Sequence, residues 1–149
     1  MTTTSVRRPH VDPLATLPGY VLRRASTAAI AELNQRLAPL GIRHADVALL
    51  LLVDSRPGMT QSDAGRVLDV QRANMVPFVG RLRRRGLIER RRADGRSHAL
   101  TLTAGGRALL ARARTLVDEC ERRLLSRVPR RLRPMVLPIL LALWNRPEP

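Results

Sequence analysis

The sequence predicts a mainly α-helical fold with one small β-hairpin, the winged helix-turn-helix. Hydrophobic residues make up 44% of the 149 residues and aromatic residues only 2%, so aliphatic side chains must build the core, which suits helices better than a β-sandwich. Two short helical patterns follow one another across a tight junction in residues 60–85. Directly after them, two strand-like segments flank an Asp-Gly turn, which predicts a hairpin.

The chain begins with a polar arm and a long helix. Residues 1–13 are polar, and we expect them to form a flexible arm. Apolar residues then recur at helical spacing over residues 14–37, which predicts a long helix. Pro39 and Gly41 end that helix. The next segment, residues 45–53, is apolar almost all round, so we expect a helix buried at the centre of the fold.

A helix-turn-helix is expected next, in residues 60–85. Thr60 and Asp63 have the spacing of a capping box, in which each side chain accepts a hydrogen bond from the other residue's amide. The second helix begins at position 70 or 71 and stops at Gly86, which supplies the left-handed residue of a helix end. Its predicted buried face consists of apolar residues spaced three and four apart, namely Met75, Phe78, Val79 and Leu82.

A hairpin and two further helices complete the prediction. Residues 87–90 and 98–102 are expected to be strands joined by a turn at residues 91–97. Thr103 should cap a long helix that runs to about Ser126 and carries an apolar stripe. The stripe consists of Leu109, Ala113, Leu116, Cys120 and Leu124. A last apolar stretch, Met135 to Trp144, is expected to be broken by Pro138.

These elements predict one compact domain with two roles. Residues 41–102 form the winged helix-turn-helix lobe, whereas residues 14–40 and 103–149 supply long helices that have no obvious partner within the chain. We therefore expect residues 14–40 and 103–149 to form the interface of a homodimer.

Charge points to a nucleic-acid partner. The formal net charge is +15, the isoelectric point is near 11.9, and every cation is an arginine because the chain has no lysine. Residues 71–96 hold nine arginines against two carboxylates, which is nearly half of the net charge in 26 residues. Codon bias in a GC-rich genome is an alternative source of arginine, but the local excess favours double-stranded DNA as the partner.

The polar face of the second short helix carries side chains suited to base edges. Asn74 can donate to and accept from adenine, and Arg72 can form a bidentate contact with guanine. Pro77 removes one backbone hydrogen bond, so it either bends the helix or is tolerated on an exposed face. The predicted DNA contacts on this helix are Gln71, Arg72, Ala73, Asn74, Pro77 and Arg81.

Two flanking segments add further predicted contacts. Thr60 and Gln61 begin a helix whose amino terminus can bind phosphate. Arg92 and Arg96 belong to the wing, where an arginine can enter a narrow minor groove. Asp94 is placed to hold the guanidinium of Arg96, although the pair could also be an ordinary surface ion pair of little energetic value.

Other functional classes have weak support. Cys120 is the single cysteine, no Cys/His cluster suggests a metal, and no cofactor motif is present. None of the three histidines has a neighbour that would suggest catalysis, so we do not expect the protein to be an enzyme. The first residues lack the apolar core of a signal peptide, and the longest apolar run is too short to span a bilayer, so we expect a cytoplasmic protein without membrane contact.

The motifs together resemble the MarR family of transcriptional regulators. The residues that carry the resemblance are 59–69, NMV at 74–76, RLRRRGLIER at 81–90, DGR at 94–96 and LTAGGRAL at 102–109. The resemblance implies a homodimer on a pseudo-palindromic operator and repression that a small aromatic or anionic ligand, or oxidation, relieves. It also implies the Asp94–Arg96 wing pair and base contacts from Arg72, Ala73, Asn74 and Pro77.

Two departures limit what the resemblance implies. Many relatives have arginine or a small polar residue in place of Pro77, so an operator sequence cannot be transferred. Oxidation-sensing relatives carry a cysteine in the first helix, whereas Cys120 lies on the stripe of the penultimate helix and is more typical of a buried structural thiol. His44, near the seam between the dimer helices and the lobe, is the candidate effector contact.

The sequence leaves two functions from different classes. A ligand-responsive, sequence-specific repressor is the first hypothesis. A nonspecific architectural protein that coats DNA through charge is the second, and its affinity would follow salt but hardly follow sequence.

Overall fold

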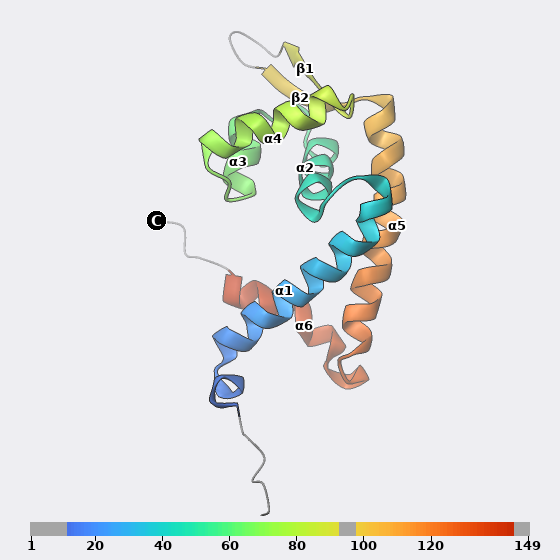
Figure 1. Ribbon diagram of the computed structural model, residues 1–149. Helices are drawn as coiled ribbons and strands as arrows, with labels where there is room; N and C mark the ends of the chain where they lie inside the picture. The colour runs from blue at the N-terminus through green and yellow to red at the C-terminus, as the bar shows by residue number, and fades with distance from the viewer. Residues whose placement is uncertain (1–11, 93–97, 145–149) are drawn as a thin grey trace, which may run out of the picture.

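The computed structural model describes residues 12–92 and 98–144, which form six α-helices, three short 3₁₀ helices and one two-stranded antiparallel sheet (Figure 1). The α-helices are α1 (Pro18–Leu37), α2 (His44–Ser55), α3 (Gln61–Val67), α4 (Arg72–Arg84), α5 (Ala104–Ser126) and α6 (Arg133–Trp144). The strands are β1 (Ile88–Arg92) and β2 (His98–Leu102), and the 3₁₀ helices are Pro13–Thr16, Ala38–Leu40 and Arg130–Leu132.

The elements form two regions. Residues 41–92 and 98–102, here called the hairpin lobe, contain α2, α3, α4 and the sheet at one end of the molecule. α1 and α6 lie at the other end, and α5 extends along both regions (Figure 1). This is the predicted fold class, and the mainly helical chain with one hairpin is confirmed.

The first helix is divided, which differs from the continuous helix expected over residues 14–37. Asp12 caps the 3₁₀ helix Pro13–Thr16, and Leu17 is then extended, with φ −98° and ψ 107°. The ring of Pro18 disfavours a helical conformation for the residue before it, so α1 starts afresh at Pro18.

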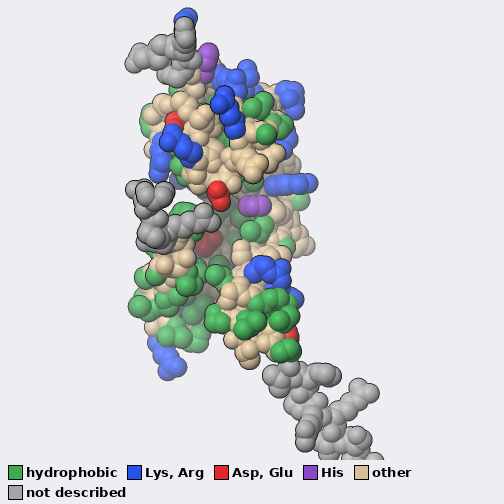
Figure 2. All heavy atoms as spheres, turned by 90° about the vertical axis from the view of Figure 1, so that its left-hand side faces the viewer, with side chains coloured by type: hydrophobic (Ala, Val, Ile, Leu, Met, Phe, Trp, Pro, Cys, Tyr) green, Lys and Arg blue, Asp and Glu red, His purple; other side chains and the backbone are tan. Residues whose placement is uncertain are grey.

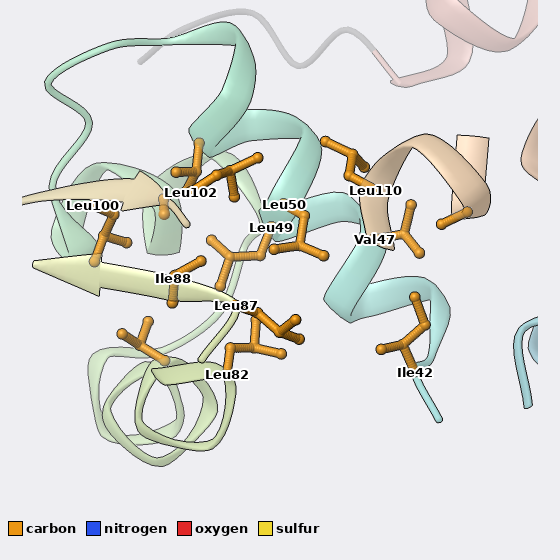
Figure 3. Close-up of a cluster of buried hydrophobic side chains, with 14 of the residues drawn as sticks. Ile42, Val47, Leu49, Leu50, Leu82, Leu87, Ile88, Leu100, Leu102 and Leu110 are labelled. Carbon is orange, nitrogen blue, oxygen red and sulfur yellow. The ribbon is translucent and has the colours of Figure 1, made fainter. Parts of the chain in front are cut away.

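α2 is the centre of the hairpin lobe, as its apolar sequence predicted. Leu49 and Leu50 are fully buried, and α2 contacts α1, α3, α5 and β2. Figure 3 shows Leu49, Leu50 and Leu110 in one cluster that also includes the strand residues Ile88 and Leu100. This cluster joins every element of the lobe and also includes Leu37 of α1 and Leu110 of α5, so the lobe and the adjoining helices share one hydrophobic core.

The residues just before α3, Met59 and Thr60, hold the hairpin against the helices. β1 pairs with β2 so that Ile88 faces Leu102 and Arg92 faces His98, which makes β1 two residues longer at its end than expected. An isolated bridge joins Thr60 to Ala99, and the Leu100 amide donates to the Met59 carbonyl at 2.8 Å. Ala99 and Leu100 are the second and third residues of β2, so the first half of this strand is fixed against the start of α3.

α5 and α6 complete the fold. Thr103 caps α5 by accepting a 2.9 Å hydrogen bond from the Gly106 amide, as predicted. The expected break at Pro138 is wrong, because α6 continues through it. A proline there removes the hydrogen bond that its own amide would donate and crowds the carbonyl four residues earlier, and this exposed helix tolerates both. α6 has no buried residue in the monomer.

Candidate nucleic-acid interface

The amino terminus of α3 has the predicted capping box. The Thr60 hydroxyl accepts from the Asp63 amide at 3.2 Å, and the Asp63 carboxylate accepts from the Thr60 amide at 3.1 Å. Hydrogen bonds from the hydroxyl and amide of Thr60 hold the pKa of Asp63 below its ordinary value of 3.8. Thr60 and Gln61 are thus fixed at the surface where α3 begins, each half-buried.

α4 presents the expected two faces. Met75, Val79 and Leu82 are buried in the lobe, and the remaining predicted core residue, Phe78, is half-buried. Gln71, which precedes the helix and caps it without a side-chain hydrogen bond, is exposed. The other predicted base contacts on this helix, Arg72, Ala73, Asn74 and Pro77, are also exposed. The first turns of α4 therefore offer polar side chains to a partner rather than to the core.

An open groove of about 920 Å³ runs between α3, the start of α4 and the hairpin. Its walls include Gln61, Gln71 and Arg72, which the sequence predicted as contacts, and also Arg90 and His98 of the sheet. Arginine side chains gather over this end of the molecule, and hydrophobic side chains gather over α1 and α6 (Figure 2). The groove thus combines hydrogen-bonding side chains with excess positive charge.

Arg90 is a groove residue that the sequence did not single out among the neighbouring arginines. Its guanidinium donates a hydrogen bond to the Gln61 side chain, so β1 and α3 meet across the groove. Arg92 is exposed at the end of β1, opposite His98. Asp94 and Arg96, the predicted wing pair, lie outside the described residues.

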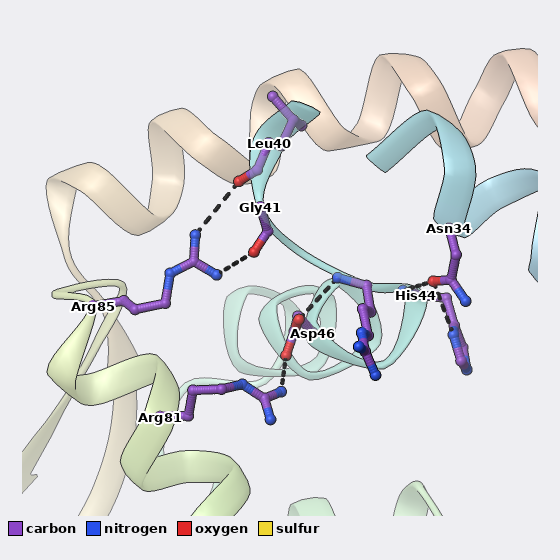
Figure 4. Close-up of polar contacts among 8 residues, drawn as sticks. Asn34, Leu40, Gly41, His44, Asp46, Arg81 and Arg85 are labelled. Carbon is purple, nitrogen blue, oxygen red and sulfur yellow. Dashed lines mark hydrogen bonds and ion pairs between the residues drawn. The ribbon is translucent and has the colours of Figure 1, made fainter. Parts of the chain in front are cut away.

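Arg81 is held by a buried carboxylate on α2. Asp46 is the one buried charged residue among residues 12–92 and 98–144, with its side chain 3% exposed. One of its oxygens accepts from the Arg81 guanidinium at 2.5 Å, and the other accepts from the Arg43 amide at 2.8 Å (Figure 4). The guanidinium also lies 5.2 Å from the centre of the Phe78 ring. This pair binds α4 to the first turn of α2.

A second arginine extends that connection. Arg85 donates to the Gly41 carbonyl at 2.6 Å and to the Leu40 carbonyl at 3.4 Å, at the elbow between α1 and α2 (Figure 4). The sequence did not predict these contacts, because Arg81 and Arg85 are simply the first and last arginines of one cationic run, RLRRR.

His44 lies at the junction of α1 and α2. Its amide donates to the Asn34 side-chain oxygen at 2.8 Å, and its ring Nδ1 lies 3.2 Å from the same oxygen. A hydrogen bond at that distance requires the proton on Nδ1, because the amide oxygen can only accept. These two contacts join α1 to the lobe at the seam that the sequence predicted, and His44 is half-buried there.

Cys120 is half-buried on α5, and burial raises the pKa of its thiol above the ordinary value of 9.0. A thiol in that range stays protonated at neutral pH and is a poor nucleophile. The described ranges contain no cluster of three potential metal ligands and no helix long and apolar enough to cross a membrane.

A capped α3, an exposed polar face on α4 and an arginine-rich hairpin define a winged helix-turn-helix protein. Comparison with known proteins gives the family. The MarR family model matches residues 40–97. An HTH-type transcriptional repressor of Mycobacterium tuberculosis, Rv2887, is 31% identical over 112 residues, which are 74% of this chain and 81% of that protein. The chain therefore belongs to the MarR family of winged helix-turn-helix transcriptional regulators.

Solved structures of the repressor CouR agree with this assignment. CouR bound to a 23-mer DNA duplex is 37% identical and superposes with a TM-score of 0.83, covering 89% of this chain and 95% of that chain. CouR bound to p-coumaroyl-CoA is 34% identical with a TM-score of 0.83, covering 93% of this chain and 99% of that one.

Proposed function

We propose that the protein is a homodimeric repressor that recognises a pseudo-palindromic DNA site and releases it when a small molecule binds. The observation that carries the proposal is the exposed polar face of α4 beside the arginine-lined groove. α4 would enter the major groove, and the hairpin would place its tip in the flanking minor groove. Because its partner is genomic DNA, we place the protein in the cytoplasm.

The contacts divide into base recognition and positioning. Gln71, Arg72, Ala73, Asn74 and Pro77 would lie along base edges, and Thr60 and Gln61 would contact phosphate from the start of α3. Arg92, Asp94 and Arg96 would supply the wing contacts. Arg81 keeps 49% of its side chain exposed beside Asp46, so it can contact a phosphate while it anchors α4.

The dimer would use residues 14–40 and 103–149, as expected from the sequence. Large hydrophobic side chains are exposed on α1 and α6, and the two patches face the same side of the molecule (Figure 2). They include Val21, Leu22, Ile30, Met135, Leu137, Ile139, Leu140, Leu141, Leu143 and Trp144. Exposed apolar surface on this scale is typical of an interface. A two-fold dimer would present its α4 helices roughly 34–36 Å apart, which is one turn of DNA.

The proposed effector combines an aromatic group with negative charge, and an aryl thioester of coenzyme A is the first candidate. The similarity to CouR supports this class. On α1, the guanidinium groups of Arg23 and Arg24 lie 5.1 and 6.0 Å from the centre of the Tyr20 ring, which gives cations beside an aromatic surface. His44 is the proposed contact at the seam. Ligand binding would lower DNA affinity by shifting the population of dimers away from the binding-competent spacing.

The deciding experiment is selection of bound sequences from a random duplex pool at physiological salt. We expect a two-fold symmetric motif, and Asn74→Ala should relax the preference at one position in each half-site by about 1–3 kcal/mol. Tight binding without any motif would instead support a nonspecific architectural protein.

The effector is tested on the selected site by fluorescence anisotropy, with p-coumaroyl-CoA, free coenzyme A and p-coumarate as probes. Release by the thioester alone would support the proposed class. Release by none of the three would remove the aryl thioester from the proposal and leave the repressor in place.

A further inference from the structure

Exposed aliphatic side chains are rare in the hairpin lobe. Among its described residues, the large hydrophobic side chains that are exposed are Val67, at 41%, and Val76, at 55%. All the other exposed large hydrophobic residues of the described chain lie in residues 14–30 and 132–144, where the proposed dimer interface covers them. Val76 is the more exposed of the two valines, and the dimer interface proposed above leaves it uncovered.

Val76 lies where a base would meet α4. It is the fifth residue of the helix, one turn after Arg72, and both side chains line the groove between α3, α4 and the hairpin. The adjacent Met75 is 1% exposed and packs into the core, whereas Val76 lies on the outer side of the helix. Among the other exposed residues of these first turns, Gln71, Arg72 and Asn74 can form hydrogen bonds, whereas Val76 offers only methyl groups. Ala73 and Pro77 are exposed and apolar as well, but Val76 is the exposed large aliphatic side chain of α4.

The chemistry that matches Val76 is the C5-methyl group of thymine. In the major groove, thymine is distinguished by this methyl group, and apolar side chains recognise it by contact. We propose that Val76 is a specificity-determining residue that packs against a thymine methyl in each half-site. This inference rests on the proposed function, because it requires α4 to enter the major groove.

The experiment removes one methyl group at a time from the DNA. Each thymine of the selected site is replaced in turn by deoxyuridine, which keeps the hydrogen-bonding edge and lacks only the methyl group. For the wild-type protein, we expect one position in each half-site at which uracil weakens binding about fourfold, because the burial of one methyl group is lost. Val76→Ala should lose this sensitivity and bind the thymine and uracil sites about equally.

Val67→Ala is the matched control, because Val67 is an exposed valine of the same lobe that lines a separate hollow beside Arg56 and Pro57. This variant should keep the wild-type sensitivity to uracil. Both substitutions replace a surface valine in or at the end of a helix by alanine, a better helix former, so both variants should fold. Circular dichroism checks this directly.

The outcomes separate this inference from the proposed function. A symmetric motif whose binding is indifferent to every uracil substitution would overturn the role of Val76 and leave the repressor intact. Full fourfold sensitivity in Val76→Ala would overturn that role as well. Selection that recovers no motif would overturn the proposed function and this inference together.

Discussion

The hairpin lobe and the two helices at the other end of the molecule differ in where their apolar side chains lie. The lobe buries a core that includes Leu49, Leu50 and Leu100, each at most 1% exposed. α1 buries only Leu37 along its 20 residues, and α6 buries none of its 12. The hairpin lobe buries its hydrophobic side chains within one chain, whereas α1 and α6 need a second surface to bury theirs. The molecule thus separates a lobe whose core is complete within one chain, with Leu37 and Leu110 of the adjoining helices included, from helix surfaces suited to association.

Charge differs between the regions in the same way. Where α1 meets α5, Arg36 pairs with Glu119 at 2.9 Å, and Glu32 pairs with Arg123 and Arg127 at 3.0 and 2.6 Å. The groove of the lobe is lined by Arg72, Arg90 and Arg66, of which Arg66 pairs with Asp63 at the groove edge, and Asp69 is the single lining carboxylate among the described residues. Arginine therefore pairs with carboxylates where the helices pack and remains in excess where a polyanion would bind.

The largest expected effect tests the join between the two regions. A Cβ atom at Gly106 would overlap the Leu87 carbonyl oxygen, which is backbone and cannot turn aside. Gly106→Ala should therefore destabilise the protein by about 3 kcal/mol, the upper range for overpacking. The free energy of unfolding from urea titration measures this change.

Gly105→Ala is the control for that substitution. Its nearest neighbours would be 3.7 Å away, which is ordinary contact, and alanine favours a helix. No loss of stability is expected there. Equal losses for the two variants would contradict the close approach of α5 to the start of β1.

The next effect concerns the bond between α2 and α4. Asp46→Ala leaves Arg81 and the Arg43 amide without their acceptor, so we expect a loss of about 2 kcal/mol, as for hydrogen bonds to charged groups. Asp54→Ala is the comparison, because Asp54 pairs with Arg114 at 3.1 Å at the surface, where its side chain is 38% exposed. That change should cost less than about 1 kcal/mol. If the two losses measured by urea titration are alike, Asp46 has no special role.

A smaller effect tests the association helices. Leu137 on α6 is 63% exposed in the monomer, and Leu137→Glu would bury a charge in the proposed interface. Sedimentation equilibrium should show at least a tenfold weaker dimer, about 1.4 kcal/mol. The lobe should keep its fold by circular dichroism. A dimer of unchanged strength would show that α6 lies outside the interface.

The smallest effect depends on pH. The hydrogen bond from Arg127 is the largest cause that holds the pKa of Glu32 below its ordinary value of 4.5, with the charges of Arg127 and Arg123 adding to it. A carboxylate with a lowered pKa stabilises the folded state above pH 4.5, and this contribution is lost as the pH falls through the folded pKa. Unfolding midpoints between about pH 6 and about pH 3 should therefore fall less in Glu32→Gln than in the wild type. Parallel curves would show that the ion pairs contribute nothing.

Much of the fold was predictable because its signals are local. Thr60 and Asp63 are three residues apart, and Thr103 and Gly106 are as well, so each cap is visible in the sequence. Gly86 was expected to be left-handed, and its φ is 68°. The core face of α4 also follows from spacing within a single helix.

The features that the sequence did not reveal depend on distant residues. Asp46 and Arg81 lie 35 positions apart, and nothing marks Arg81 among its cationic neighbours as the partner of a buried carboxylate. The bridge between Thr60 and Ala99 is a similar case. Pro18 was a local signal for the division of the first helix, but the prediction followed the apolar spacing instead. Among the predicted contacts, four line one groove, namely Thr60, Gln61, Gln71 and Arg72, and whether any predicted contact touches DNA stays a prediction.

The contacts of Arg81 and Arg85 couple the position of α4 to the orientation of α1. They bind α4 to the first turn of α2 and to the elbow at Leu40 and Gly41, so the proposed recognition helix α4 is tied to the end of α1. α1 has 20 residues and is therefore about 30 Å long. If the whole helix pivots by about 5° about its amino-terminal end, the elbow at its other end moves by about 3 Å. In the proposed dimer, opposite displacements in the two subunits would change the span between the α4 helices by up to about 6 Å, which is close to two base-pair steps of DNA.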